Sequence, residues 1–227
     1  MGKSSESSRA ARRLRVQLTL PELLARHALH PFPALIERGK RVSFAALAEV
    51  SRRVAGGLYR LGVAPGDRVA LWLPSTTAWL TVFFACAQLG AIAIAVNTRF
   101  RSHELNDVVA RYGAKVLVFW PDFKGIDFGG TLAACDAHAL ERLQSVVAYS
   151  EDGMPAPRSL AGKAVFDYAT LSSGEPLPEN RARAEAACVM FTTSGTTNVP
   201  KFVLHSHRAV IRHALDVARG FAIGADS

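Results

Sequence analysis

The chain has 227 residues, 49% of them hydrophobic, which is enough to bury a sizeable core. Its formal net charge is +8, and half of that excess lies in residues 1–16, where five basic residues face one acidic residue. The remaining charge forms no basic stripe along the sequence, which argues against nucleic acid as a partner.

The N-terminal stretch, residues 1–17, is rich in Ser, Arg and Ala and lacks helical apolar periodicity. It is predicted to be a disordered basic tail in front of one folded unit, residues 18–227. A mitochondrial transit peptide shares this composition, but a plain extension is the preferred interpretation. The cysteines, Cys86, Cys135 and Cys188, are widely spaced, and each is predicted to be a small buried thiol with no disulfide, metal or nucleophilic role. That pattern favours a reducing compartment and hence a cytoplasmic protein.

Helix and strand patterns alternate from Leu18 onward. Thr19 and Glu22 form a capping-box pattern that opens the first helix, and Ser43 caps a second helix, which Gly62 ends. The predicted helices cover approximately residues 19–30, 43–61, 74–89, 102–112, 137–143, 166–171 and 207–219. The predicted strands cover residues 34–36, 41–42, 68–73, 91–96, 115–119, 145–149, 186–191 and 202–204. Such alternation predicts an α/β fold with a mostly parallel sheet flanked by helices.

Two stretches need a separate interpretation. Residues 151–183 repeat Pro, Gly and Ser and are predicted to form a long connection that contains one short helix. Residues 69–98 contain no charged side chain, and that length could span a membrane. Because Pro74, Gln88 and Gly90 interrupt this stretch, a buried helix–strand pair is preferred and no transmembrane segment is expected.

The run Thr193–Thr197 places hydroxyl residues around Gly195, and Pro200 and Lys201 close it. An apolar strand leads into this run and a second apolar segment leads out, so the polar residues between them are predicted to form a loop. Backbone N–H groups, hydroxyls and an ammonium group are all hydrogen-bond donors, and together they suit a polyphosphate. A solvated Ser/Thr loop is the alternative for any single Thr-Ser-Gly.

The whole string resembles the phosphate-binding signature of the adenylate-forming superfamily, usually Thr-Ser-Gly-Thr-Thr-Gly-x-Pro-Lys-Gly-Val followed by Ser-His. The order of Thr193–Thr197, Pro200–Lys201 and Ser206–His207 matches it. Asn198 and Phe202 stand where the family usually has glycine. Asn tolerates positive φ, whereas Phe202 adds a side chain where close backbone approach or only the start of a strand could be required.

Earlier segments are similar to the opening half of an acyl-CoA synthetase. They are residues 61–70, 89–97, 101–105 and 114–118, and the resemblance covers about Leu18 to Phe221. It implies the N-terminal half of the large domain of an adenylate-forming enzyme, that is, a partial AMP-binding domain. The family's glutamate for Mg²⁺, its ribose-binding aspartate and its C-terminal domain with a lysine are not found, so a truncated chain with an exposed sheet edge is expected.

The implied activity is that of an acid–CoA ligase in fatty acid metabolism. ATP first activates a carboxylic acid as an acyl-adenylate, and the thiol of CoA then displaces AMP; Mg²⁺ and the loop would stabilise the developing charge without a protein nucleophile. The resemblance assigns nucleotide binding to Thr193, Ser194, Gly195, Thr196, Thr197 and Lys201. Four of these residues supply hydroxyls to the β- and γ-phosphates, the glycine permits backbone approach, and the lysine supplies positive charge.

No residue is assigned as a catalytic group or a metal ligand. His205 and His207 could form a zinc pair, but no third ligand is near in sequence, so structural roles are preferred. Since His207 matches the family's Ser-His, it is expected to lie near the site. Two other functions stay open: a non-catalytic nucleotide-binding relative, in which Asn198 and Phe202 impair the loop, and an interaction protein that acts through its basic tail.

Overall fold

The computed structural model describes residues 18–151, 156–193 and 201–224; the predicted tail lies outside this range. Its helices are α2 (Leu20–Arg26), α3 (Phe44–Arg60), α4 (Thr77–Leu89), α5 (Ser102–Asn106), the π-helix η1 (Asp107–Arg111), the 3₁₀ helix η2 (Phe123–Gly125), α6 (Phe128–Ala133), α7 (Tyr168–Ser173) and α8 (His207–Gly220). Its strands are β1 (Leu35–Glu37), β2 (Lys40–Val42), β3 (Arg68–Trp72), β4 (Ile92–Ala95), β5 (Ala114–Phe119), β6 (Ser145–Ala148), β7 (Ser159–Leu160), β8 (Lys163–Asp167), β9 (Ala187–Thr193) and β10 (Lys201–Ser206).

The described residues form one eight-stranded sheet with the order β10-β9-β4-β3-β5-β6-β8-β7, and a separate hairpin of β1 and β2. Within the large sheet, β10 on β9 and β7 on β8 are antiparallel, and the other neighbours are parallel. The α/β fold with a mostly parallel sheet is therefore confirmed. Because the parallel strands run the same way, their carboxyl ends share one edge of the sheet, where open α/β folds bind ligands.

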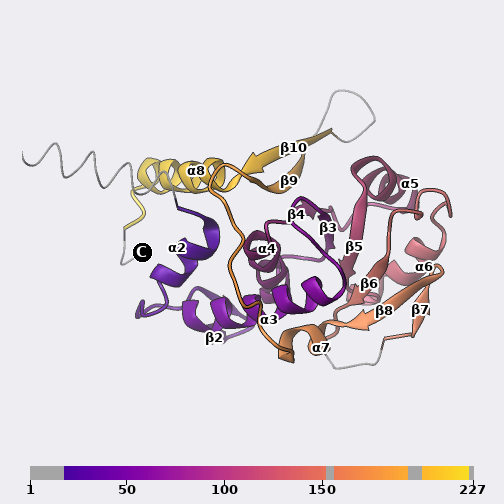
Figure 1. Ribbon diagram of the computed structural model, residues 1–227, viewed down its shortest axis with the longest axis horizontal. Coiled ribbons are helices and arrows are strands. Elements are labelled where there is room, and N and C mark those ends of the chain that lie inside the picture. The colour runs from indigo at the N-terminus through magenta and orange to yellow at the C-terminus, as the bar shows by residue number, and fades with distance from the viewer. Residues whose placement is uncertain (1–17, 152–155, 194–200, 225–227) are drawn as a thin grey trace, which may run out of the picture.

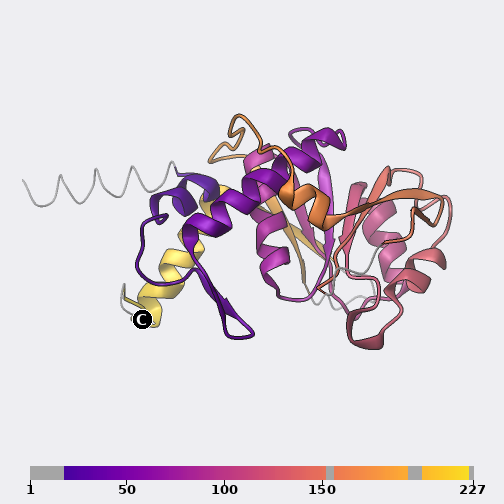
Figure 2. The ribbon, with the colours of Figure 1, turned by 90° about the horizontal axis from the view of Figure 1, so that it is seen from below.

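Helices cover both faces of the sheet, as Figures 1 and 2 show. Alternate residues of β3 point to opposite faces. Val69 and Leu71 join a buried cluster with α3 and α4, whereas Ala70 and Trp72 join a second cluster with α5 and α6. The uncharged stretch 69–98 is thus a strand, a helix and a strand inside the core, and no described helix is long and apolar enough to cross a membrane.

Local sequence signals explain the boundaries of the main helices. The Ser43 hydroxyl accepts a hydrogen bond from the Ala46 N–H at the start of α3, and the predicted capping box of Thr19 and Glu22 is present at α2. Helix α4 begins at Thr77, later than predicted, because Thr76 and not Pro74 provides the cap. Gly90 then ends α4 with a left-handed φ of 73°, which Gly adopts without steric cost.

The connection predicted for residues 151–183 is wrong in part. It contains β7 and β8, and β8 adds a parallel strand beside β6, because the alternation in Lys163–Asp167 is too short to stand out among Pro and Gly. The helix predicted at 137–143 is also wrong: these residues form turns, and the helix of this region is α6. The short helix predicted at 166–171 exists two residues later, as α7.

The apolar strand that leads into the loop, β9, is buried only in its first half. Cys188 and Val189 are fully buried, but Phe191 is 41% exposed, and Val203 and Leu204 of β10 are 42% and 51% exposed. The reason is that β10 lies at the edge of the sheet, with β9 as its neighbour in the described sheet. The expected apolar sheet edge is therefore present in this chain.

Candidate functional site

The hairpin of β9 and β10 carries the predicted phosphate loop. Thr193 is the last residue of β9, Lys201 is the first of β10, and the two are directly paired across the antiparallel ladder. Paired Cα atoms in such a ladder are about 5 Å apart. The predicted site residues Ser194, Gly195, Thr196 and Thr197 lie outside the described residues, so the structure brings together the two ends of the loop.

The position of these ends in the sheet follows from strand direction. Strand β9 is parallel to β4, with Val189 beside Ala93 and Met190 beside Ile94, so Thr193 lies at the shared carboxyl edge. Lys201 reaches the same edge because β10 runs antiparallel to β9. A loop at this edge, with donors at both ends, can face a bound anion as the ligand sites of other open α/β sheets do.

Phe202, the larger of the two departures from the signature, has a defined place. It is the second residue of β10, pairs with Thr192, and packs half-buried against the cluster on the α5–α6 face. Its ring centroid lies 4.2 Å from that of Tyr112 at the end of η1. The side chain therefore lies at the start of a strand and contacts protein, which is the second of the two alternatives drawn from the sequence.

His207 is not near the loop, contrary to expectation. It is the first residue of α8, beyond the far end of β10 from Lys201, and five strand steps of about 3.4 Å separate the two ends of β10. Its ring has no solvent exposure, and Nδ1 accepts a hydrogen bond of 3.3 Å from the Leu20 N–H. Burial lowers the pKa of His207 to about 4, and the Glu22 carboxylate opposes part of that shift.

Of the two histidines considered as a zinc pair, His205 lies in β10 and His207 in α8, where His207 Nδ1 accepts the Leu20 N–H of α2. In the part of the chain that the structure describes, no group of three or more His, Cys, Asp or Glu residues is placed to hold a metal ion. The sequence between Glu185 and Asp216 contains no carboxylate, the group that Mg²⁺ prefers. The residue types in this stretch, hydroxyls and a lysine, suit an anion.

The cysteines contribute no nucleophile to this site. Cys86 and Cys188 are buried as predicted, whereas Cys135 is half-buried, and all three are free thiols. Burial raises the pKa of Cys188 to about 12 and also raises the pKa of Cys86, so both remain protonated at neutral pH.

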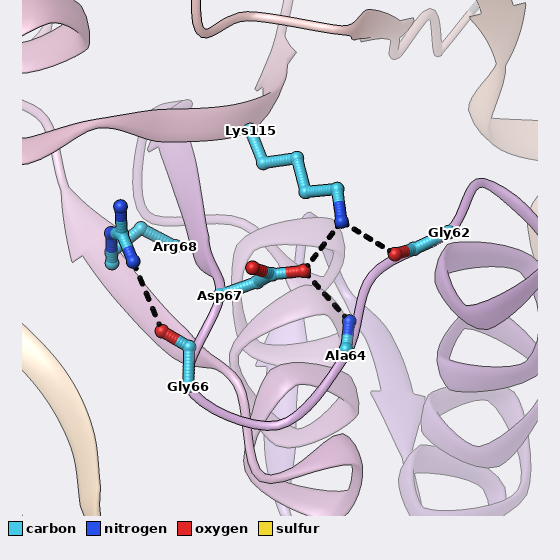
Figure 3. A network of polar contacts seen from close by, with 6 residues as sticks. All are labelled: Gly62, Ala64, Gly66, Asp67, Arg68 and Lys115. Atoms are coloured by element: carbon cyan, nitrogen blue, oxygen red, sulfur yellow. Dashed lines mark hydrogen bonds and ion pairs between the residues drawn. The ribbon is translucent and has the colours of Figure 1, made fainter.

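The segment 61–70 forms a polar network at the opposite, amino edge of the sheet (Figure 3). Lys115 Nζ donates to Asp67 Oδ2 and to the Gly62 carbonyl, both at 2.7 Å, and the Ala64 N–H also donates to Asp67. Burial raises the pKa of Asp67, but the hydrogen bonds and positive charges of Lys115 and its neighbours outweigh this and leave it lowered. The network ties the turn before β3 to β5 and so has a structural role.

Fold and site together define an α/β protein with a hydroxyl-rich, lysine-ended loop at the carboxyl edge of its sheet. The chain belongs to the family described as AMP-binding enzyme, whose sequence model matches residues 25–226. This agrees with the resemblance to adenylate-forming enzymes seen in the sequence.

Individual relatives are ligases that act on acyl groups and CoA, judged by their names. The chain is 31% identical over 192 residues to 3-[(3aS,4S,7aS)-7a-methyl-1,5-dioxo-octahydro-1H-inden-4-yl]propanoyl:CoA ligase of Mycobacterium tuberculosis, covering 84% of this chain and 37% of that protein. It is 29% identical over 199 residues to the mitochondrial medium-chain acyl-CoA ligase ACSF2 of Rattus norvegicus, covering 79% and 31%. The chain thus spans about a third of the length of the curated relatives it matches.

The fold is shared with solved structures of the same kind. Acetoacetyl-CoA synthetase from Streptomyces lividans superposes with a TM-score of 0.74 at 24% identity, covering 89% of this chain and 32% of that one. The matched part is therefore an N-terminal portion of an adenylate-forming enzyme, as predicted.

Proposed function

We propose that the chain provides the ATP-phosphate site of an acid–CoA ligase. The observation that carries the proposal is the hairpin, which pairs Thr193 with Lys201 at the carboxyl edge of a parallel sheet in a member of the AMP-binding family. The proposed contacts to the β- and γ-phosphates come from the hydroxyls of Thr193, Ser194, Thr196 and Thr197, from the Gly195 backbone and from Lys201. Mg²⁺ enters as part of the ATP complex, held by phosphate oxygens.

The proposed reaction has two steps. A carboxylate attacks the α-phosphate of ATP and releases pyrophosphate, and the thiol of CoA then displaces AMP to form a thioester. Donors at the loop favour the first step because negative charge develops on the departing pyrophosphate. Because the relatives are about three times longer than the matched part, the acid and CoA sites are proposed to need residues beyond it. The free thiols support a cytoplasmic location.

Displacement of a fluorescent ATP analogue tests the proposed phosphate site. ATP and pyrophosphate are expected to compete more strongly than AMP, since the loop is assigned to the β- and γ-phosphates. Competition by AMP as strong as that by ATP, with none by pyrophosphate, would contradict the assignment. Acid-dependent release of pyrophosphate, measured with the C-terminal portion of a relative supplied, tests turnover separately, and ATP binding without any such release would then favour the non-catalytic relative.

A further inference from the structure

The loop end of the β9–β10 hairpin extends beyond the strand that supports it. Strand β9 pairs with β4 through Val189 and Met190, and Phe191 to Thr193 continue past these pairs with β10 as their ladder partner. The exposed face of this extension includes Phe191 and Val203. Figure 1 shows the β9–β10 hairpin at the top of the molecule, with α5 to its right. A hairpin end with one ladder partner and an exposed face has low local stability unless side chains hold it.

A side-chain contact supports this extension on the α5–α6 face of the sheet. The ring centroids of Phe202 and Tyr112 lie 4.2 Å apart with an interplanar angle of 51°. The Arg111 guanidinium carbon lies 6.0 Å from the centroid of the Tyr112 ring. Met190 joins the same cluster two ladder pairs further along. Successive side chains of a strand point to opposite faces of the sheet, so Lys201 points away from the face on which Phe202 packs. Because the two residues are adjacent, anchoring the Phe202 side chain also fixes the backbone of Lys201.

We propose that Phe202, through its contact with Tyr112, is a positioning residue that sets Lys201 for the ATP phosphates. The inference rests on the proposed function. It explains how a bulky ring can stand where the resembled family usually has Gly: in this chain the ring holds the end of the hairpin. The proposed ligand is still the ATP phosphates. The ring restricts the conformations of Lys201 before ATP binds, which lowers the entropy cost of binding.

The test uses the full chain and four variants. Phe202→Ala and Tyr112→Ala remove the contact, Phe202→Tyr keeps a ring, and Leu204→Ala is the matched control, since Leu204 lies two residues along on the same strand face and is 51% exposed. Hydrogen exchange of the β10 amides reports the anchoring without any ligand. Calorimetry with MgATP reports its consequence for nucleotide binding.

Phe202→Ala and Tyr112→Ala are expected to speed exchange in β10 about threefold to tenfold, the effect of losing one aromatic pair, and to weaken ATP binding by a similar factor. Phe202→Tyr and Leu204→Ala are both expected to keep the wild-type exchange rate in β10 and the wild-type ATP affinity. Unchanged exchange in Phe202→Ala, or faster exchange with wild-type ATP affinity, would overturn the inference. An absence of ATP binding in the wild-type chain would instead refute the proposed function and with it the role toward ATP, while exchange would still decide whether the contact anchors the hairpin.

Discussion

Lowering the pH from 7 to 5 is expected to destabilise the protein through His207. The folded state holds this ring neutral, because it is fully buried and its Nδ1 must keep a lone pair to accept the Leu20 N–H. Its pKa is about 4 when folded, against an ordinary value of 6.5. Between these values the unfolded chain binds more protons, so stability falls as the pH falls. The two pKa values give a loss of about 2 kcal/mol between pH 7 and pH 5.

Urea unfolding at both pH values, followed by far-UV circular dichroism, measures this loss. His207→Asn is the informative variant, because an Asn oxygen can still accept the Leu20 N–H but does not titrate. Between pH 7 and pH 5, the free energy of unfolding of this variant is expected to fall by about 2 kcal/mol less than that of the wild type. His213→Asn, on the exposed side of the same helix, is expected to retain it. Equal pH dependence in wild type and His207→Asn would refute the reasoning.

Two further predictions concern the scaffold, and urea unfolding checks both. In Gly56→Ala the added Cβ would overlap the Glu175 carbonyl where the chain crosses α3, so the free energy of unfolding is expected to fall by about 2 kcal/mol. In Gly129→Ala the added Cβ has room, and the free energy of unfolding is expected to rise by up to about 1 kcal/mol. Similar effects of both changes would contradict this. Lys115→Met is expected to cost about 1 kcal/mol at neutral pH, and the cost should shrink as the pH falls through the lowered pKa of Asp67, where that carboxylate becomes protonated. An equal cost at pH 3 would count against the ion pair.

The elements that could be predicted from the sequence are those with strong local signals. Helix α3 has a Ser43 cap, a long apolar period and a terminal Gly62, and its predicted bounds differ from the observed ones by about one residue. Strand β8 was missed because its exposure alternates over five residues, and only pairing with β6 identifies it. Long-range pairing of this kind leaves little trace in local composition.

The candidate site shows the same division. The order Thr193 to Lys201 predicted the residue types and a polar loop between two apolar segments, whereas the antiparallel pairing of those segments came from the structure. The surroundings of His207 could not be predicted, because its partner Leu20 is 187 positions away in the sequence. Tyr112 carried no signal at all, since its meeting with Phe202 depends on how the hairpin extends past β4.

Calorimetric titration of the chain with MgATP, beside Lys201→Ala, tests the central claim most directly. Lys163→Ala, on β8 and distant in the strand order, serves as the matched loss of one positive charge. The account predicts saturable binding by the wild type and by Lys163→Ala, and binding at least about tenfold weaker in Lys201→Ala, the usual effect of removing a charge-assisted contact. Equal affinity in wild type and Lys201→Ala, or no binding by a demonstrably folded wild-type chain, would contradict it.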